Sequence, residues 1–247
     1  MTYKLLPTIL AGLLASAAVH AGEKAHWDYS DHAGPKHWGE LDPAYATCAS
    51  GKNQSPINLT GMIEGELPEL KVDYTPGANE VINNGHTVEV KYAPGSTMTV
   101  DGHKFELKQL HFHTPSENTI EGRHLPMEAH FVHADKEGQL AVIAIMYESG
   151  KVNPELEKAW QYMPSKVGET QVLAKPVNAA SLMPSDLAYY RFNGSLTTPP
   201  CSEGVNWYVM KSFDSASQEQ IDAFDQAMMH HANNRPVQPI NARVVIQ

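Results

Sequence analysis

The triplet His111-Phe112-His113, followed by Glu128-Ala129-His130, is the most informative part of this chain. Each triplet lies in a run whose composition is typical of a β-strand, residues 105–113 and 127–134. Side chains alternate between the two faces of a strand, so His111 and His113 should share one face, and Glu128 and His130 should share one face of the other strand. Two such strands, paired side by side, bring three imidazoles to one point.

Three converging imidazoles are typical of a catalytic zinc site. Three protein ligands leave the fourth tetrahedral position of the zinc ion to water. A metal-bound His usually donates its second ring N–H to a carboxylate, amide or carbonyl oxygen. Gln109 and Glu128 each precede a candidate ligand by two residues on the same face. On its own, a His-x-His on a strand is more often a solvated pair, with Gln109 an exposed amide and Glu128 a half-buried acid. The two partner residues favour the metal.

Distinctive segments recur along the rest of the chain. They are Gly34-Pro35-Lys36-His37-Trp38, Gln54-Ser55-Pro56-Ile57, Asn83-Asn84-Gly85-His86, Gln109-Leu110-His111-Phe112-His113, Ser116-Glu117, Met127-Glu128-Ala129-His130-Phe131-Val132-His133, Gly194-Ser195-Leu196-Thr197-Thr198-Pro199-Pro200-Cys201 and Asn234-Arg235-Pro236-Val237-Gln238-Pro239-Ile240-Asn241. In this order and at this spacing they resemble the alpha-class carbonic anhydrases, of a bacterial exported type. The first fifth of the chain and residues 150–186 are not closely covered. The resemblance implies a mainly β fold, with a central twisted, largely antiparallel mixed sheet of about ten strands and a few short peripheral helices.

Periodicity within the chain agrees with a mainly β fold. We expect strands at residues 69–74, 78–83, 87–92, 97–100, 105–113, 127–134, 140–148, 187–193 and 206–213. The run 140–146 is apolar on both faces and uncharged, as a strand covered on both sides requires. Helices are expected only at 153–160, with Pro154 in the first turn, and at 218–230, with Ser215 and Ser217 as caps.

Length and charge favour one exported domain. The chain has 247 residues and a net charge of −10 at pH 7. Residues 1–21 combine Lys4, an apolar run over 5–19 and a small-residue end at Ala21, the layout of a secretory signal. We expect cleavage after Ala21, a single catalytic domain over 22–247 and a periplasmic or secreted location. A retained membrane anchor is the alternative, but the run is short for a bilayer. The negative charge argues against nucleic acids and membranes as partners.

The resemblance implies zinc-dependent, reversible hydration of carbon dioxide to bicarbonate and a proton. Zinc held by three His lowers the pKa of its water to about 7, a value for which carbonic anhydrase is itself the reference case. In the family, the Thr matching Thr197 accepts the proton of the hydroxide and donates its own to the acid matching Glu117, which can only accept when ionised. Thr198 is expected to contact bicarbonate. Without the resemblance, the residues alone favour Glu117 as an acid in a surface loop and Thr197 as an ordinary turn residue.

Carbon dioxide has no net dipole, so an apolar wall should hold it beside the nucleophile. Residues that match the wall positions of the family are Val132, Val142, Leu196, Val205 and Trp207. Alternation places Val132 on the ligand face beside His130. For Val142, inside an apolar strand, the wall position and ordinary core packing stay equal alternatives.

A proton relay is the last requirement, and imidazole suits it because its pKa lies near neutrality. His86 matches the family position that lines the cavity without touching zinc, and Tyr29 and Glu89 are further candidates for the proton pathway. From the residues alone, His86 is a surface loop histidine. His26, His32 and His37 are exposed substitutes near the N-terminus.

Cys48 and Cys201 are the two cysteines of the chain. In an exported protein, two cysteines favour a disulfide over two free thiols. The resemblance implies the same bridge, from a cysteine near the N-terminus to the loop that carries Thr197 and Thr198.

Two other classes of protein fit parts of the pattern. An ester-cleaving zinc hydrolase uses the same chemistry, and minor esterase activity is expected beside CO2 hydration, but no His-Glu-x-x-His motif is present. A non-catalytic binding module occurs among relatives that lack a zinc ligand, whereas all three ligand positions here are His.

The resemblance further implies sulfonamide and anion inhibitors at the zinc. It leaves open whether the chain forms a homodimer. Thr114 departs from the animal pattern, where Trp often follows the second ligand.

Overall fold

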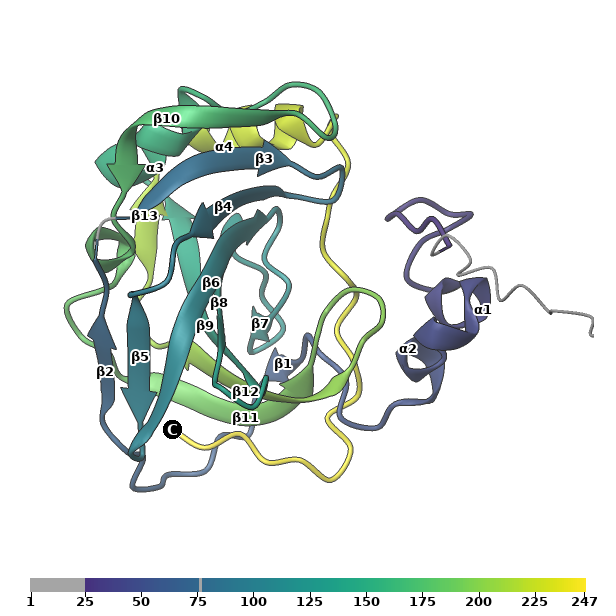
Figure 1. Ribbon diagram of the computed structural model, residues 1–247. Coiled ribbons are helices and arrows are strands. Elements are labelled where there is room, and N and C mark those ends of the chain that lie inside the picture. Colours follow the sequence, from purple (N-terminus) through teal and green to yellow (C-terminus); the bar gives the residue numbers. More distant parts are fainter. Residues whose placement is uncertain (1–24, 76) are drawn as a thin grey trace, which may run out of the picture.

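The structure is a computed structural model that describes residues 25–75 and 77–247, and these residues form mainly β-strands (Figure 1). The strands are β1 (Asn58–Leu59), β2 (Leu70–Asp73), β3 (Ala78–Asn83), β4 (Val88–Tyr92), β5 (Thr97–Val100), β6 (His103–His113), β7 (Thr119–Ile120), β8 (Met127–Ala134), β9 (Leu140–Ser149), β10 (Thr170–Val177), β11 (Tyr189–Ser195), β12 (Glu203–Met210) and β13 (Asp214–Ala216). The helices are α1 (Trp38–Leu41), α2 (Thr47–Ser50), α3 (Pro154–Trp160) and α4 (Gln218–Ala227), with short 3-10 turns at Pro43–Tyr45 and Ala179–Leu182.

One large mixed sheet organises these strands. Its order is β10-β3-β4-β6-β8-β9-β12-β11, and β2, β5 and β13 extend it to eleven strands in the described part of the chain. Strands β12 and β13 pair with β9 in parallel, and the remaining pairs of the sheet are antiparallel. The expected fold class, a large mixed sheet with a few short helices, is confirmed.

The two faces of the sheet bury different side chains. On one face, α3 and α4 pack through Trp160 and Phe224 against Phe112 of β6, with the Phe112 and Trp160 rings 4.8 Å apart. On the other face, Val142 and Trp207 belong to a second apolar cluster. Figure 1 shows α3 and α4 at the β10–β3 end of the sheet. The second face is therefore the one that lies away from α3 and α4.

A β-bulge in β6 determines which residues face this site. The pairing of β6 with β8 shifts register between Leu107 and Gln109. Phe105 and Leu107 lie in the same core cluster as Leu110 and Phe112, although regular alternation would separate these pairs. The bulge therefore turns His111 and His113 away from the core, which is how bulges commonly re-aim side chains.

Several elements were missed or displaced in the sequence prediction. Strand β10 lies in the stretch that the resemblance did not cover, and β1, β7, β13, α1 and α2 were not expected. Helix α4 ends at Ala227 rather than near His230. The C-terminal strand pair, β11 and β12, is shifted by two or three residues relative to the expected ranges.

Helix α2 is joined to the loop between β11 and β12 by the disulfide between Cys48 and Cys201. Figure 1 shows α1 and α2 beside the loop between β11 and β12. The expected secretory signal, residues 1–21, lies outside the described residues. Within 25–75 and 77–247, no helix is long and apolar enough to cross a membrane.

Candidate metal centre and active site

His111, His113 and His130 come together on the face of the sheet that lies away from α3 and α4. His111 lies opposite His130 in the β6–β8 register, and His113 lies opposite Glu128. One ring nitrogen from each of the three histidines falls within 4.8 Å of the other two. Strand pairing alone therefore positions a three-nitrogen group that could hold a metal ion.

An oxygen atom lies close to the second ring nitrogen of each histidine. His111 Nδ1 is 2.7 Å from Gln109 Oε1, and His113 Nδ1 is 2.7 Å from the Asn233 carbonyl oxygen. His130 Nε2 is 3.0 Å from Glu128 Oε1. Carbonyl oxygens only accept, so the hydrogen bonds of His111 and His113 place a proton on Nδ1 of each ring. The His130 contact is at hydrogen-bond distance but lacks full hydrogen-bond geometry. Nε2 of His111 and of His113 is then unprotonated and free to bind a metal, and a proton on Nε2 of His130 would leave its Nδ1 equally free.

The residues present fit a divalent metal ion. Burial lowers the pKa of His113 to about 4 and lowers the pKa of His111 and His130 well below the usual value, so the imidazoles are neutral as metal ligands must be. Within the described residues, the buried Nε2 of His113 has no hydrogen-bond partner. A buried nitrogen without a partner is costly, and a metal ion would satisfy it.

Glu128 is fully buried behind the histidines. Its carboxylate accepts hydrogen bonds from the backbone N–H groups of Glu117 and Asn118, at 2.7 and 2.8 Å, and from the Asn118 side chain at 2.7 Å. Burial raises the pKa of Glu128, while the bonds from Asn118 oppose this shift. The carboxylate is thus held rigidly beside His130.

Glu117 is also fully buried, although its sequence context alone suggests a surface loop. Its Oε1 accepts the backbone N–H of Arg235 at 2.9 Å, and its Oε2 lies 3.4 Å from His113 Nε2. Burial raises the pKa of Glu117 to about 8, opposed by the Arg235 N–H and the Thr197 hydroxyl. Thr197 is near enough to exert this effect, yet Oε2 lacks a partner with full hydrogen-bond geometry among the described residues.

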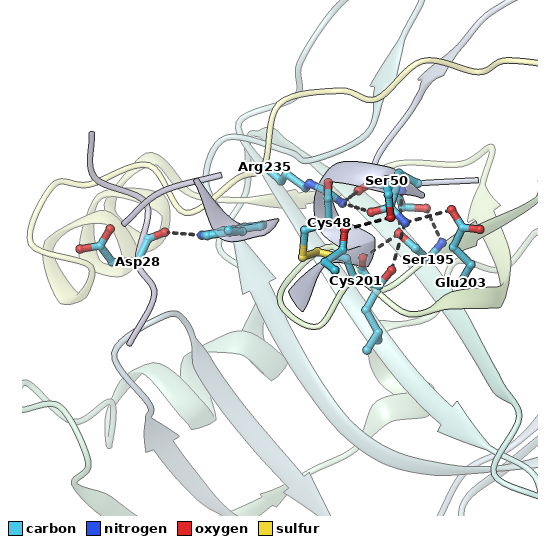
Figure 2. The surroundings of a disulfide bond; sticks show 12 residues. Asp28, Cys48, Ser50, Ser195, Cys201, Glu203 and Arg235 are labelled. Carbon is cyan, nitrogen blue, oxygen red and sulfur yellow. Dashed lines mark hydrogen bonds between the residues drawn. A yellow bond between two sulfur atoms is a disulfide. The ribbon is translucent and has the colours of Figure 1, made fainter. Parts of the chain in front are cut away.

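Thr197 and Thr198 lie on the loop between β11 and β12, which is anchored at its far end. The Cys48–Cys201 disulfide predicted from the sequence is confirmed. Figure 2 shows the Arg235 guanidinium beside this bridge, where it donates to the Cys48 carbonyl at 2.9 Å. Gln54 donates to the Cys201 carbonyl at 3.0 Å. The buried Arg235 therefore links the disulfide region, through its guanidinium, to Glu117, through its backbone.

A cavity of about 150 Å³ opens in front of the histidines. His111, His113 and Thr198 line it, and so do three residues expected to act in proton transfer, His86, Tyr29 and Glu89. Glu89 of β4 lies opposite His111 in the register, and burial raises its pKa. Tyr29 is a hydroxyl donor at this cavity, and burial raises its pKa well above the usual value.

His86 is half-buried at the edge of the cavity. Its ring stacks on Trp27, with centroids 3.7 Å apart and planes 10° from parallel. Burial lowers the pKa of His86, and so does His26, while Asp28 raises it. Of the proposed substitutes, His26 lines a neighbouring hollow that His86 shares, whereas His32 and His37 do not line the cavity in front of the histidines.

The five expected wall residues lie in one apolar cluster. Val142, Val205 and Trp207 are buried in it, and Val132 and Leu196 pack against it while remaining partly exposed. The Trp207 ring meets the His130 ring edge to face, with centroids 4.9 Å apart. The apolar cluster thus borders the three-histidine group.

Sequence reasoning missed Asn233, Arg235 and Trp27 as parts of this site. Asn233 and Arg235 act through a backbone carbonyl and a backbone N–H, which carry no residue-specific signal. The available signal was the position of Arg235 inside a recognised segment. Trp27 lies in the first fifth of the chain, where the resemblance was weak, and only the clustering of aromatic residues there pointed to it.

Fold and site together define a class, a mainly β protein in which two paired strands present to a small cavity three histidines that could hold a metal ion. The family model of eukaryotic-type carbonic anhydrases matches residues 33–247. The chain belongs to this family, as its sequence predicted, and the family implies hydration of carbon dioxide. A carbonic anhydrase of Neisseria gonorrhoeae is 50% identical over 248 residues, which cover 98% of this chain and 97% of that protein.

A carbonic anhydrase of Pectobacterium carotovorum is 45% identical, with full coverage of both chains. Among solved structures, the alpha-carbonic anhydrase of Thermovibrio ammonificans in complex with the inhibitor sulfanilamide superposes with a TM-score of 0.88 and 48% identity. That alignment covers 90% of this chain and 99% of the other.

Proposed function

We propose that this protein catalyses the reversible hydration of carbon dioxide with a zinc ion held by His111, His113 and His130. One observation carries the proposal: three imidazole nitrogens converge within 4.8 Å while an oxygen atom lies within 3.0 Å of the second nitrogen of each ring. A closed structural zinc site would have four protein ligands, whereas three leave one position for a reacting water. When bound, zinc makes hydroxide available near neutral pH, as it does in carbonic anhydrase, the reference case for this effect.

Glu117 and Thr197 orient the nucleophile in this proposal. An ionised Glu117 can only accept a hydrogen bond, so its Oε2 would accept one from the Thr197 hydroxyl. The Thr197 oxygen would then be free to accept a hydrogen bond from the nucleophilic hydroxide and so orient it toward carbon dioxide. The pKa of about 8 would oppose ionisation at neutral pH. A nearby dication favours the charged carboxylate and lowers that pKa again.

Carbon dioxide is proposed to rest on the apolar cluster of Val132, Val142, Leu196, Val205 and Trp207. A molecule without a net dipole gains by leaving water for an apolar surface, and it competes poorly for polar groups. The contact between Trp207 and His130 brings this surface next to the ligands. Thr198, which lines the cavity, is proposed to contact bicarbonate.

His86 is the proposed proton relay between the cavity and bulk water. It lines the cavity without belonging to the three-histidine group. Because it is half-buried, its ring can exchange protons both with the cavity and with bulk water. Imidazole accepts and releases protons near neutral pH more readily than the other side chains there. Tyr29 and Glu89 are proposed to shape the proton pathway beside it.

The same cavity would admit small esters, so we propose weak esterase activity beside CO2 hydration. We propose further that sulfonamides bind at the zinc, since the Thermovibrio ammonificans relative was solved with sulfanilamide. A disulfide favours an oxidising compartment. We therefore propose a signal peptide at residues 1–21, a catalytic domain over 22–247 and a periplasmic or secreted location.

The test is CO2 hydration by the purified protein before metal removal, after chelation, and after addition of zinc or magnesium. The proposal predicts loss of activity on chelation and recovery with zinc but not with magnesium, which prefers oxygen ligands. Ester hydrolysis measured on the same samples should be far slower than CO2 hydration. Activity that persists without metal, or ester hydrolysis that outpaces CO2 hydration, would contradict the proposal.

A further inference from the structure

Asn233 contacts both the metal-ligand strand and the loop that carries His86. Its backbone carbonyl accepts His113 Nδ1–H at 2.7 Å. Its buried side chain does something different: Nδ2 donates to the carbonyls of Phe112, at 2.9 Å, and His86, at 3.0 Å. Its Oδ1 accepts the Thr114 N–H at 2.8 Å. The side-chain amide therefore spans the strand and the His86 loop.

The His86 loop has few other ties near the histidine itself. Asn84 Oδ1 accepts the His86 N–H at 2.9 Å, but this bond is local to the loop. Thr87 donates its hydroxyl to the Phe112 carbonyl at 2.6 Å, one residue further along. The His86 ring stacks on Trp27, and its Nδ1 has no hydrogen-bond partner among the described residues. The imidazole is thus placed by stacking and by its backbone.

We propose that the Asn233 side-chain amide is a positioning residue for proton transfer, which holds the His86 backbone at a fixed place relative to the strand of His111 and His113. This inference rests on the proposed role of His86 as the relay. It separates two functions within one residue: the carbonyl of Asn233 orients a metal ligand, and the amide orients the relay. Displacement of a reacting group by about 1 Å can cost up to 10²-fold in rate, so a single tether can matter.

The two functions of Asn233 are separable by mutation because every substitution retains the backbone carbonyl. Asn233→Ala removes the bond to the His86 carbonyl and the bond from the Thr114 N–H, while the Phe112 carbonyl keeps its bond from Thr87. The backbone carbonyl of residue 233, which accepts His113 Nδ1–H, remains. A defect in proton transfer without a defect in metal binding is therefore the expected signature.

The experiment measures kcat and kcat/KM for CO2 hydration at low buffer concentration in four zinc-loaded proteins: the native chain, Asn233→Ala, His86→Ala and the double variant. We expect Asn233→Ala to lower kcat by about ten-fold, with kcat/KM changed by less than about two-fold, because CO2 attack precedes proton transfer. Imidazole in the buffer should restore kcat. In the His86→Ala background, Asn233→Ala should cause no further loss of kcat, because residues that act as one unit are not additive.

Asn234→Ala is the matched control. Asn234 is the adjacent amide in the same segment, and its side chain donates to the Ser116 carbonyl at 3.4 Å rather than to His86. Any loss of kcat in Asn234→Ala should not be restored by imidazole. Zinc content and a thermal melt accompany each variant, and Asn233→Ser replaces Asn233→Ala if the latter does not fold.

Three outcomes would overturn the inference: an unchanged kcat in the Asn233 variants, an equal loss of kcat and kcat/KM that imidazole does not restore, or a full additive loss in the His86→Ala background. If His86→Ala loses kcat and imidazole restores it, any of these three outcomes refutes only the role of Asn233. No such loss in His86→Ala refutes the relay role itself, and the inference falls with it.

Discussion

His111 and His130 lie directly opposite each other in the antiparallel pair of β6 and β8, with their rings edge to face and centroids 5.2 Å apart. This pairing exists because the bulge between Leu107 and Gln109 changes the phase of β6. The positions of the ligands therefore depend on sheet registration rather than on flexible loops. Sites built on strands are held more precisely than sites on loops.

His86→Ala should lower the maximal rate of CO2 hydration by about ten-fold or more, with zinc content and kcat/KM nearly intact. The reason is that His86 lines the cavity without belonging to the three-histidine group. Stopped-flow measurements with and without small imidazole buffers check this. If kcat/KM falls as heavily as kcat, or the buffers give no rescue, another cavity group is the relay.

Glu128→Gln should weaken metal affinity by about 10- to 100-fold, the usual cost of losing a partner of a metal-bound histidine. The neutral amide cannot accept at both ends, although donors from Asn118 and His130 face this carboxylate. Competition with a chelator of known affinity measures the change. Glu121→Gln is the control, because that carboxylate is exposed and accepts a hydrogen bond from the Thr60 hydroxyl. Equal affinities in the two variants would show that Glu128 has a purely structural role.

Reduction of the disulfide should destabilise the protein, because the bridge closes a sequence separation of 153 residues. The chain-entropy model gives about 5 kcal/mol for such a loop, which corresponds to a fall in Tm of at most about 10–20 °C. Thermal melts with and without reductant check this, and thiol titration should find two thiols only after reduction. A Cys48→Ser/Cys201→Ser variant should melt at one temperature in both conditions. Two titratable thiols in the untreated protein would disprove the bridge.

Acid should destabilise the fold through His133, which is buried on the face of β8 away from the site. Its Nε2 lies 2.7 Å from the Tyr74 hydroxyl, and burial lowers the pKa of His133 from 6.5 to about 3. The unfolded chain thus takes up a proton near pH 6.5 that the folded chain takes up only near pH 3. The free energy of unfolding should fall as pH decreases through this window, by up to about 1.4 kcal/mol per pH unit for this group.

Urea unfolding at a series of pH values between 6.5 and 3 measures this contribution. His133→Gln should show a shallower dependence of the free energy of unfolding on pH than the native chain. His103→Gln, which changes an exposed histidine at the start of β6, should keep the native dependence. Identical slopes for all three proteins would exclude His133 as an acid-sensitive group.

The sequence predicted the histidine triad but not how the strand delivers it. Strict alternation over 105–113 would put Phe105 on the same face as His111, whereas the structure buries Phe105 with Leu110 and Phe112. A bulge depends on which two strands pair and in what register, and neither is visible in a local run of residues.

Interactions of the site that cross the chain were also beyond sequence reasoning from the residues alone. The contact from His113 to the Asn233 carbonyl spans 120 residues, and that from the Arg235 N–H to Glu117 spans 118. In each contact one partner is a backbone atom, of Asn233 or of Arg235, so the type of that residue does not predict the contact. Glu117 accordingly was expected in a surface loop unless the family resemblance was invoked, and it is fully buried.

Edge elements were missed for a different reason. Strand β10 pairs only with β3, and most of its side chains are exposed, so it lacks the apolar alternation of a half-buried strand. The helices α1 and α2 have four residues each, too few to display a helical period. Neither failure affected the three histidines, which lie on the long central strands β6 and β8.

The most direct test of a catalytic zinc centre is to measure zinc content and CO2 hydration together in His113→Ala. His103→Ala is the control, since His103 belongs to the same strand but lies exposed at its other end. The account predicts about one zinc ion per chain and full activity in the native protein and in His103→Ala, with both lost in His113→Ala because two histidines cannot complete the ligand set. Native zinc content with full activity in His113→Ala would contradict it.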